Sequence, residues 1–166
     1  SVLTGLDFGW SISIDAGGNR VIVGSPSENM TVGAAYIYLR NVSNAWPQEA
    51  RLSGSVSSLF GYTTSIDASG DRVIVGAHGE NDFRGAAYVY VRNVSNAWTR
   101  EARLNDSGFP SSSFGYAVST DAAGKRIIVG ATGEGVTYIY VRNASNAWLQ
   151  EAHLTVSPSL SLGYAV

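Results

Sequence analysis

The sequence has no cysteine, two histidines and few charged residues. The lack of cysteine excludes disulfide bonds and thiolate metal sites, and it does not decide whether the protein is secreted. Charged residues make up 14% of the chain, against roughly 25% in ordinary globular proteins. The formal net charge of −2 argues against a general nucleic-acid or anionic-membrane binder, because either function needs a basic surface.

Long apolar runs and catalytic motifs are missing as well. No apolar stretch reaches the roughly 18 residues of a membrane span, and the opening residues, SVLTGLDFGW, lack the basic start and apolar core of a signal peptide. Neither Gly-x-Ser-x-Gly, His-Glu-x-x-His nor a phosphate loop occurs. His78 beside Glu80 is the one acid–base candidate, and His153 is expected to be a solvated side chain.

The chain is rich instead in glycine (19 residues) and in aromatic residues (11%), a composition typical of all-β proteins with tight turns. One unit occurs three times, over residues 8–52, 60–104 and 114–154. The first two copies are identical at 30 of 45 positions, and the third is four residues shorter within a single loop. Such a period indicates a repeat architecture, and 166 residues are enough for one domain with a sizeable core.

Each copy predicts four strands. In the first copy, residues 8–14 alternate between apolar and polar positions, with one face formed by Phe8, Trp10, Ile12 and Ile14. Residues 20–24 (RVIVG) are mostly apolar without alternation, which favours a strand covered on both faces. Residues 34–40 place Tyr36 and Tyr38 on one face.

Residues 45–52 complete the copy and carry Pro47 together with Glu49 and Arg51. Proline lacks the N–H that a central strand needs, and charges on an edge discourage unwanted strand pairing. This fourth strand is therefore predicted to be the outer edge of a small antiparallel sheet.

Several short motifs recur in register in this order: Phe-Gly, then Arg-Val-Ile-Val-Gly, then Gly-Ala-Ala-Tyr-Ile/Val-Tyr. Four short strands at a period of about 50 residues are typical of β-propeller blades. These motifs resemble those of FG-GAP repeats, the blades of integrin-α-type propellers. The resemblance covers nearly the whole chain, and it implies a propeller with an extracellular binding or scaffolding role. It does not imply one activity.

Many FG-GAP repeats carry an Asp-rich calcium loop, and this chain departs from that pattern. The corresponding turns begin at Asp15, Asp67 and Asp121, and each offers one or two suitable side chains where calcium prefers six to eight oxygen ligands. The third turn has Lys125 at a ligand position. We therefore expect these aspartates to cap tight hairpins, with no metal or other cofactor bound.

The repeats divide the chain into blade-like units at residues 8–59, 60–113 and 114–161, followed by residues 162–166 (LGYAV). That final segment matches the opening strand of a fourth repeat. Closed propellers have about four to eight blades. Either the chain is part of a longer array, or its terminal strand completes a neighbouring chain, as heterologous strand pairing permits.

Asn-x-Ser/Thr sequons suggest N-glycosylation, and they occur at Asn29, Asn41, Asn93, Asn105 and Asn143. Three of them, Asn41, Asn93 and Asn143, occupy the same predicted hairpin, where a glycan would point to solvent. The alternative is that Asn and Ser are simply good turn residues.

Two further sets recur in every copy. Glu28, Glu80 and Glu134 fall in the variable loop, where they either line a ligand-binding rim or are merely solvated. The tryptophans Trp46, Trp98 and Trp148 either stack on sugars or pack between blades, as do the paired tyrosines Tyr36/Tyr38, Tyr88/Tyr90 and Tyr138/Tyr140.

From these features we expect a non-catalytic extracellular structural or interaction module, in a larger propeller or a head-to-tail assembly. The expected partners are copies of itself or further repeats, joined through terminal strands, and glycans or extracellular proteins. The alternatives are a carbohydrate-binding propeller, with one weak site per blade multiplied by avidity, and an enzyme that uses His78 with Glu80.

Overall fold

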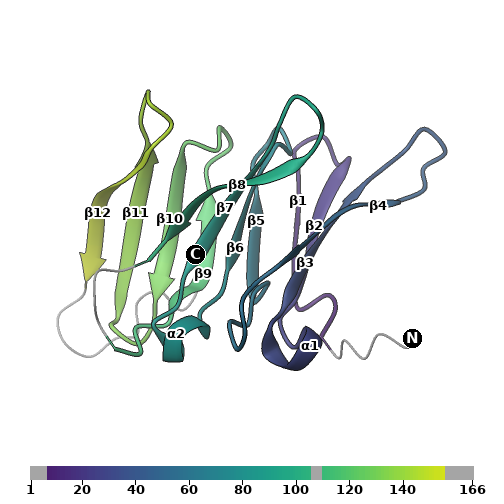
Figure 1. Cartoon of the computed structure of the whole chain (residues 1–166). Coiled ribbons are helices and arrows are strands. Elements are labelled where there is room, and N and C mark those ends of the chain that lie inside the picture. Colours follow the sequence, from purple (N-terminus) through teal and green to yellow (C-terminus); the bar gives the residue numbers. More distant parts are fainter. Residues whose placement is uncertain (1–6, 106–109, 156–166) are drawn as a thin grey trace.

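The computed structural model describes residues 7–105 and 110–155. These residues form three antiparallel sheets of four strands that stand side by side (Figure 1). Each sheet is built from one copy of the repeat, and its strands follow chain order. The all-β, blade-like architecture expected from the sequence is confirmed, as three neighbouring blades without a closed ring.

The strands of blade 1 are β1 (Ser11–Ile14), β2 (Arg20–Ser25), β3 (Ala34–Leu39) and β4 (Gln48–Ser53). Blade 2 contains β5 (Thr63–Ile66), β6 (Arg72–Gly76), β7 (Ala87–Arg92) and β8 (Trp98–Leu104). Blade 3 contains β9 (Phe114–Thr120), β10 (Arg126–Ala131), β11 (Val136–Arg142) and β12 (Trp148–Thr155). As predicted, the fourth strand of each copy lies at an edge of its sheet.

Some predicted strand boundaries are wrong. β1 begins at Ser11 rather than at residue 8, because residues 7–10 form a turn closed by the Trp10 N–H and the Asp7 carbonyl at 3.1 Å. Gly9 allows this turn with a φ of 96°, which side-chain-bearing residues rarely adopt. Likewise, β4 begins at Gln48, after Pro47, whose carbonyl accepts the N–H of Leu39.

The variable loop contains a short turn in the first two copies, α1 (Glu28–Thr31) and α2 (Glu80–Phe83). Neither is a regular helix, because two central residues of each have positive φ, at 51° and 54° in α1 and at 50° and 55° in α2. The third copy replaces the turn with the shorter sequence ATGEG, which accounts for its missing residues.

The hydrophobic core lies between the blades. One cluster joins Ile22, Ile37 and Leu52 of blade 1 to Phe60 and Val75 of blade 2. A second cluster repeats this arrangement between blades 2 and 3, with Ile74, Val89 and Leu104 against Phe114 and Val129. The prediction that the second strand is covered on both faces holds for β6, which lies in the middle blade. In β2 burial alternates, because no blade packs on the outer face of blade 1 in the described structure.

We call the side of a blade that faces the preceding blade its leading face. The side that faces the following blade is its trailing face. Each internal junction pairs the trailing face of one blade with the leading face of the next.

Candidate functional site

Each hairpin between the first two strands is closed by its aspartate. One carboxylate oxygen of Asp15 accepts the backbone N–H groups of Asn19 and Arg20 at 2.8 and 3.1 Å. Asp67 and Asp121 make the same pair of bonds in blades 2 and 3. The capping role that the sequence predicted for these three aspartates is thus observed.

The arginine that follows each hairpin extends toward the next blade. Arg20 is 5% exposed, and its Nη1 donates to the Gly70 carbonyl of blade 2 at 3.0 Å. Arg72 repeats the contact with the Gly124 carbonyl of blade 3 at 3.2 Å. A buried cation needs a counter-charge, and an edge-strand glutamate supplies it in each blade.

These glutamates sit in β-bulges. The register of β3 with β4 shifts between Ile37 and Tyr38, so that Glu49 has no partner residue in the ladder, and β8 and β12 shift at the same place. A bulge re-aims a side chain. Glu49 accepts two bonds from Arg20, at 2.8 and 3.1 Å, a bidentate geometry that is among the stronger hydrogen-bonded ion pairs.

The same glutamate binds a tryptophan of the following blade. The indole N–H of Trp98 donates to Glu49 at 3.2 Å, and that of Trp148 donates to Glu101 at 3.0 Å. Both indoles also pack against the apolar clusters between the blades. The inter-blade interpretation of these two repeated tryptophans is confirmed, and neither indole N–H is available to a sugar.

Glu101 is the most connected of these carboxylates. It accepts bonds from Arg72 at 3.1 and 3.2 Å and from Arg142 of blade 3 at 2.6 Å, besides the bond from Trp148. Desolvation raises the pKa of Glu101, but the hydrogen bonds from Arg72, Trp148 and Arg142 and the charge of Arg72 together lower it below its ordinary value. The carboxylate therefore remains ionised inside the junction.

Sequence reasoning treated Glu49 and Glu101 as charges that protect an edge, and it missed their role between blades. Their side chains are only 13% and 10% exposed. The signal that could have found them is the joint recurrence of Arg, Trp and Glu in every copy. Nothing local in the sequence marks a bulge that turns the carboxylate toward another blade.

The tyrosine pairs pack within their own blades. Phe60, which opens the second copy, lies 5.4 Å from Tyr88 and 6.2 Å from Tyr90 between ring centroids. Phe114 contacts Tyr138 and Tyr140 in the same way. The repeated aromatic residues at these positions therefore build the core.

The variable-loop glutamates are held by side chains of their own blade. Glu80 is buried and accepts bonds from the Tyr88 hydroxyl and from Arg103, at 2.6 Å from Arg103 Nη2. Burial and the bond to Glu80 raise the pKa of Tyr88 to about 12. Glu28 has the equivalent partners Tyr36 and Arg51.

In blade 3 the tyrosine partner remains, since Tyr138 donates to Glu134 at 2.9 Å. His153 replaces the arginine, and its exposed ring lies 6.4 Å from that of Tyr138. The three loop glutamates belong to separate blades, and Glu134 lines an open pocket together with Tyr138 and His153.

His78 lies in an aromatic cage rather than beside Glu80. Its ring is 4.1 Å from Tyr62 and 5.1 Å from Tyr116, measured between centroids, and the residue is 7% exposed. Burial lowers the pKa of His78 to about 4, so the imidazole is neutral at pH 7. Among the described residues no hydrogen bond joins it to Glu80, which is bound to Tyr88 and Arg103.

The three hairpin sequons share one geometry. The side-chain oxygen of Asn41 accepts the N–H groups of Ser43 and Ala45 at 2.9 and 3.0 Å, and Asn93 and Asn143 make the same two bonds. The amide nitrogen, to which a glycan would be attached, carries no hydrogen bond in the described structure. Residues 42 and 94, at the tips, are fully exposed. Asn29 in α1 and Asn105 after β8 are exposed as well.

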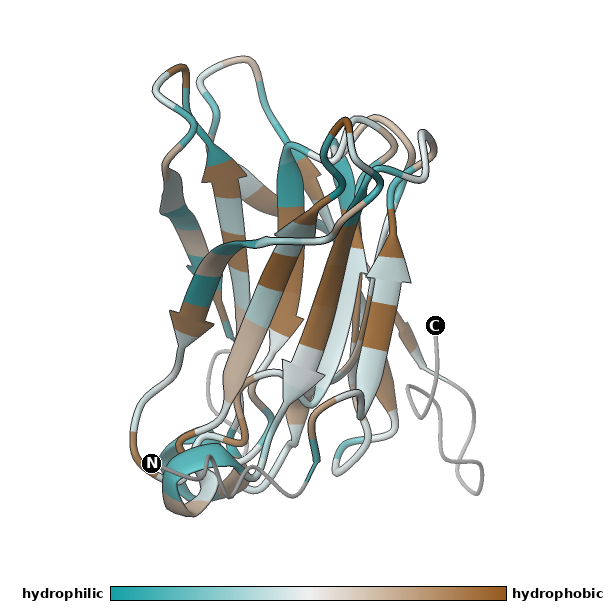
Figure 2. Cartoon of the chain, turned by 90° about the vertical axis from the view of Figure 1, so that its right-hand side faces the viewer, coloured by the Kyte–Doolittle hydropathy of each residue, from teal (hydrophilic) through white to brown (hydrophobic). Residues whose placement is uncertain are grey.

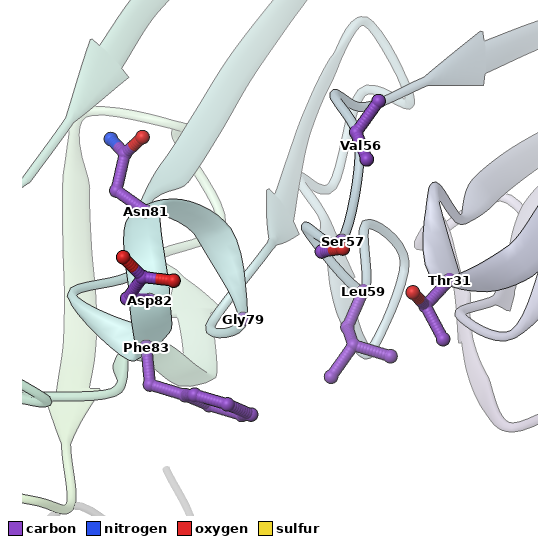
Figure 3. A pocket seen from close by; sticks show the side chains of 8 residues that line it. All are labelled: Thr31, Val56, Ser57, Leu59, Gly79, Asn81, Asp82 and Phe83. Atoms are coloured by element: carbon purple, nitrogen blue, oxygen red, sulfur yellow. The ribbon is translucent and has the colours of Figure 1, made fainter.

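An open pocket lies between the loop that follows β4 and the α2 turn (Figure 3). It is lined by Thr31, Val56, Ser57, Leu59, Gly79, Asn81, Asp82 and Phe83. None of the predicted site residues lines it. In residues 7–105 and 110–155 no three metal-ligating side chains gather closely enough to hold an ion. Across the same ranges, no helix has the length and apolar character that a membrane crossing requires.

Comparison with known proteins supports the repeat assignment. The model of the FG-GAP repeat matches residues 46–90, which extend from the edge strand of blade 1 to β7. No curated protein sequence matches the chain significantly.

Two crystal structures share the fold. One is a candidate 6-phosphogluconolactonase from Bacteroides fragilis NCTC 9343, with a TM-score of 0.63 over 93% of this chain. The other is a candidate 6-phosphogluconolactonase from Bacteroides uniformis ATCC 8492, with a TM-score of 0.60 over 87%. Both are 10% identical to this chain, which spans 40% of the length of each. At that identity the likeness concerns the fold alone. The chain therefore carries an FG-GAP repeat at residues 46–90, within an all-β array of three propeller-like blades.

Proposed function

We propose that the chain is a non-catalytic extracellular structural and interaction module, whose blades act in a larger propeller or in a head-to-tail assembly. The observation that supports this most is the use of the repeated polar residues. Arg20, Glu49 and Trp98, like Arg72, Glu101 and Trp148, join neighbouring blades. Polar side chains that bond to the neighbouring blade favour a scaffold. In a catalyst, the polar side chains instead converge on one pocket.

The hairpin sequons support an extracellular site of action. Each presents an exposed turn in which the asparagine oxygen is bonded to the backbone and the nitrogen is left for modification. FG-GAP repeats are also typical of extracellular proteins. Peptide mass spectrometry of native material should find N-glycans on Asn41, Asn93 or Asn143. Three unmodified asparagines would remove the glycoprotein part of the proposal.

The non-catalytic part has its own test, suggested by the fold neighbours. The chain should not accelerate hydrolysis of 6-phosphogluconolactone above the spontaneous rate, measured by acid release at constant pH against heat-denatured protein. Hydrolysis that rises in proportion to chain concentration would contradict it. The carbohydrate-binding alternative has less support, because Trp98 and Trp148 donate their indole N–H groups to the preceding blade. Binding on a glycan array at high protein concentration would restore that alternative.

A further inference from the structure

Within residues 7–105 and 110–155, the leading face of blade 1 is an uncovered apolar surface. It carries Phe8, Ile12 and Ile14, which are 55%, 73% and 56% exposed. In blade 2 the counterparts of Phe8 and Ile14 are Phe60 and Ile66, which are 0% and 8% exposed. Figure 2 views the chain from this end and shows hydrophobic segments along its strands. A contiguous exposed apolar face of this kind marks an interaction surface.

The trailing face of blade 3 is likewise uncovered within the described residues. Leu154 is 51% exposed, whereas its counterparts Leu52 and Leu104 are 7% and 6% exposed inside the two junctions. Arg126 and Glu151 form the same ion pair as the buried pairs of blades 1 and 2, at 2.9 Å, but their side chains are 55% and 39% exposed. With Ile128 and Ile139 they line an open pocket on this face.

We propose that a second copy of the chain docks head to tail, with its blade 1 on blade 3 of the first copy. The proposal deepens the assembly role given above and rests on it. The internal junctions specify the contacts. The Trp46 indole N–H of one copy would donate to Glu151 of the other, as Trp98 does to Glu49. Arg126 would donate to the Gly18 carbonyl, as Arg72 does to that of Gly124.

Backbone hydrogen bonds at the internal junctions specify a third contact. The Ala16 N–H donates to the Ala68 carbonyl at 3.3 Å, and the Ala68 N–H donates to that of Ala122 at 3.1 Å. The next member of this series joins the Ala122 N–H of one copy to the Ala16 carbonyl of the other. The leading face carries the hydrogen-bond donor Trp46, which is 40% exposed. The trailing face carries the acceptor, the Glu151 carboxylate.

This complementarity favours a partner built on the same repeat, and a second copy supplies it. If two copies met through their trailing faces, Glu151 of one would oppose Glu151 of the other. The Trp46 indole of each copy would then have no acceptor. Residues 162–166 (LGYAV), the predicted opening strand of a fourth repeat, lie outside the described residues, and they contain no tryptophan for Glu151. A head-to-tail contact is heterologous, and it yields a ring if the rotation closes and a filament if it does not. With three blades per copy, two copies give six, within the range of about four to eight in closed propellers.

The test uses two variants, each of which disables one face. Trp46→Ala removes the donor of the leading face, and Glu151→Lys removes the acceptor of the trailing face. Each should raise the dissociation constant of self-association about tenfold or more, as loss of an interface anchor does. Val42→Ala, at an exposed hairpin tip on neither face, is the matched control and should leave association unchanged. Particle mass is followed by sedimentation velocity across a concentration series, with circular dichroism as the check on folding.

Mixing the two variants gives the sharpest result. The Trp46→Ala copy keeps an intact trailing face, and the Glu151→Lys copy keeps an intact leading face. An equimolar mixture can therefore form one unaltered junction, and a heterodimer should appear at concentrations where each variant alone is monomeric. No rescue on mixing would contradict the head-to-tail geometry.

Cross-linking gives an independent test, because the chain has no native cysteine. The Ala68→Cys, Ala122→Cys double variant should close a disulfide within one chain and so calibrates the geometry. The Ala16→Cys, Ala122→Cys double variant should link separate chains, whereas Ala16→Cys or Ala122→Cys alone should not. Linkage by either single variant would indicate contact between like faces and would overturn the proposal.

A native chain that remains monomeric at every concentration would overturn it as well, as would association unaffected by both face variants. Neither result bears on glycan occupancy or on lactone hydrolysis. Failure of this proposal is thus distinguishable from failure of the proposed function.

Discussion

Replacing Glu101 by glutamine tests whether the bulge carboxylates hold the blades together. The substitution keeps the size of the side chain and removes its charge. It leaves the guanidinium groups of Arg72 and Arg142 without their shared counter-ion, at side-chain exposures of 11% and 22%. The Trp148 indole loses a charged acceptor at the same time. The perturbation therefore acts on both sides of the junction between blades 2 and 3.

The expected loss of stability follows from burial. Removing one partner of a buried ion pair costs about 3–5 kcal/mol, and glutamine recovers part of that because its carbonyl can still accept a hydrogen bond. We expect Glu101→Gln to lower the free energy of unfolding by roughly 2–3 kcal/mol. For a chain of this size the loss corresponds to about 4–12 °C in Tm. Glu151→Gln is the matched control, because Glu151 is exposed and binds Arg126 alone among the described residues.

Urea unfolding followed by tryptophan fluorescence measures the difference, with protein dilute enough to be monomeric. The pH dependence adds a second readout. The lowered pKa of Glu101 means that its stabilisation is present above the ordinary carboxyl pKa and is lost as pH falls through the folded-state value. The gap between the parent and Glu101→Gln should therefore shrink below about pH 4.5. Equal losses for Glu101→Gln and Glu151→Gln at pH 7, or a gap that persists in acid, would refute the reasoning.

Two further substitutions test other parts of the fold. His78→Phe should make the chain less sensitive to acid. Burial lowers the pKa of His78 from 6.5 to about 4, so the parent should lose about 2 to 3 kcal/mol as pH falls through that window. Unfolding curves at pH 7, 5.5 and 4 would show this, and an unchanged acid sensitivity in the variant would contradict it. Gly76→Ala should destabilise the chain by about 1–3 kcal/mol, because the new Cβ would lie 2.1 Å from the Gly115 carbonyl oxygen of the next blade. Gly17→Ala meets only side-chain atoms, of Asn19 at 3.1 Å and of Asp15 at 3.8 Å, and should cost much less in the same thermal melts.

The repeat, the four strands of each copy and the capped hairpins could be predicted because they depend on local patterns. Alternation, Gly-rich turns and an edge-strand proline act within a few residues of one another. The boundaries were less accurate. The first strand begins at Ser11 because Gly9 adopts a positive φ and turns the chain at residues 7–10, a choice that apolar alternation does not reveal.

The junction residues were beyond sequence reasoning, although all of them were visible in the repeats. Glu49 and Glu101 face the next blade because a bulge shifts the strand register at each of them. Register depends on pairing across the sheet, and the pattern of a single strand does not contain it. His78 and Glu80 are two residues apart in sequence, yet tertiary packing gives them different partners. His78 lies in an aromatic cage, and Glu80 binds a tyrosine and an arginine of its own blade.

The sequence by itself determined the all-β repeat, the turns and the equivalence of the three copies. The tertiary structure decided which equivalent residues are buried. Arg20 and Arg126 occupy the same position of the repeat, but one is nearly inaccessible and the other has a side chain 55% exposed. The physical reason is that burial of a residue depends on whether a neighbouring blade packs on it, and in the described residues one face of blade 1 and one face of blade 3 have no such blade.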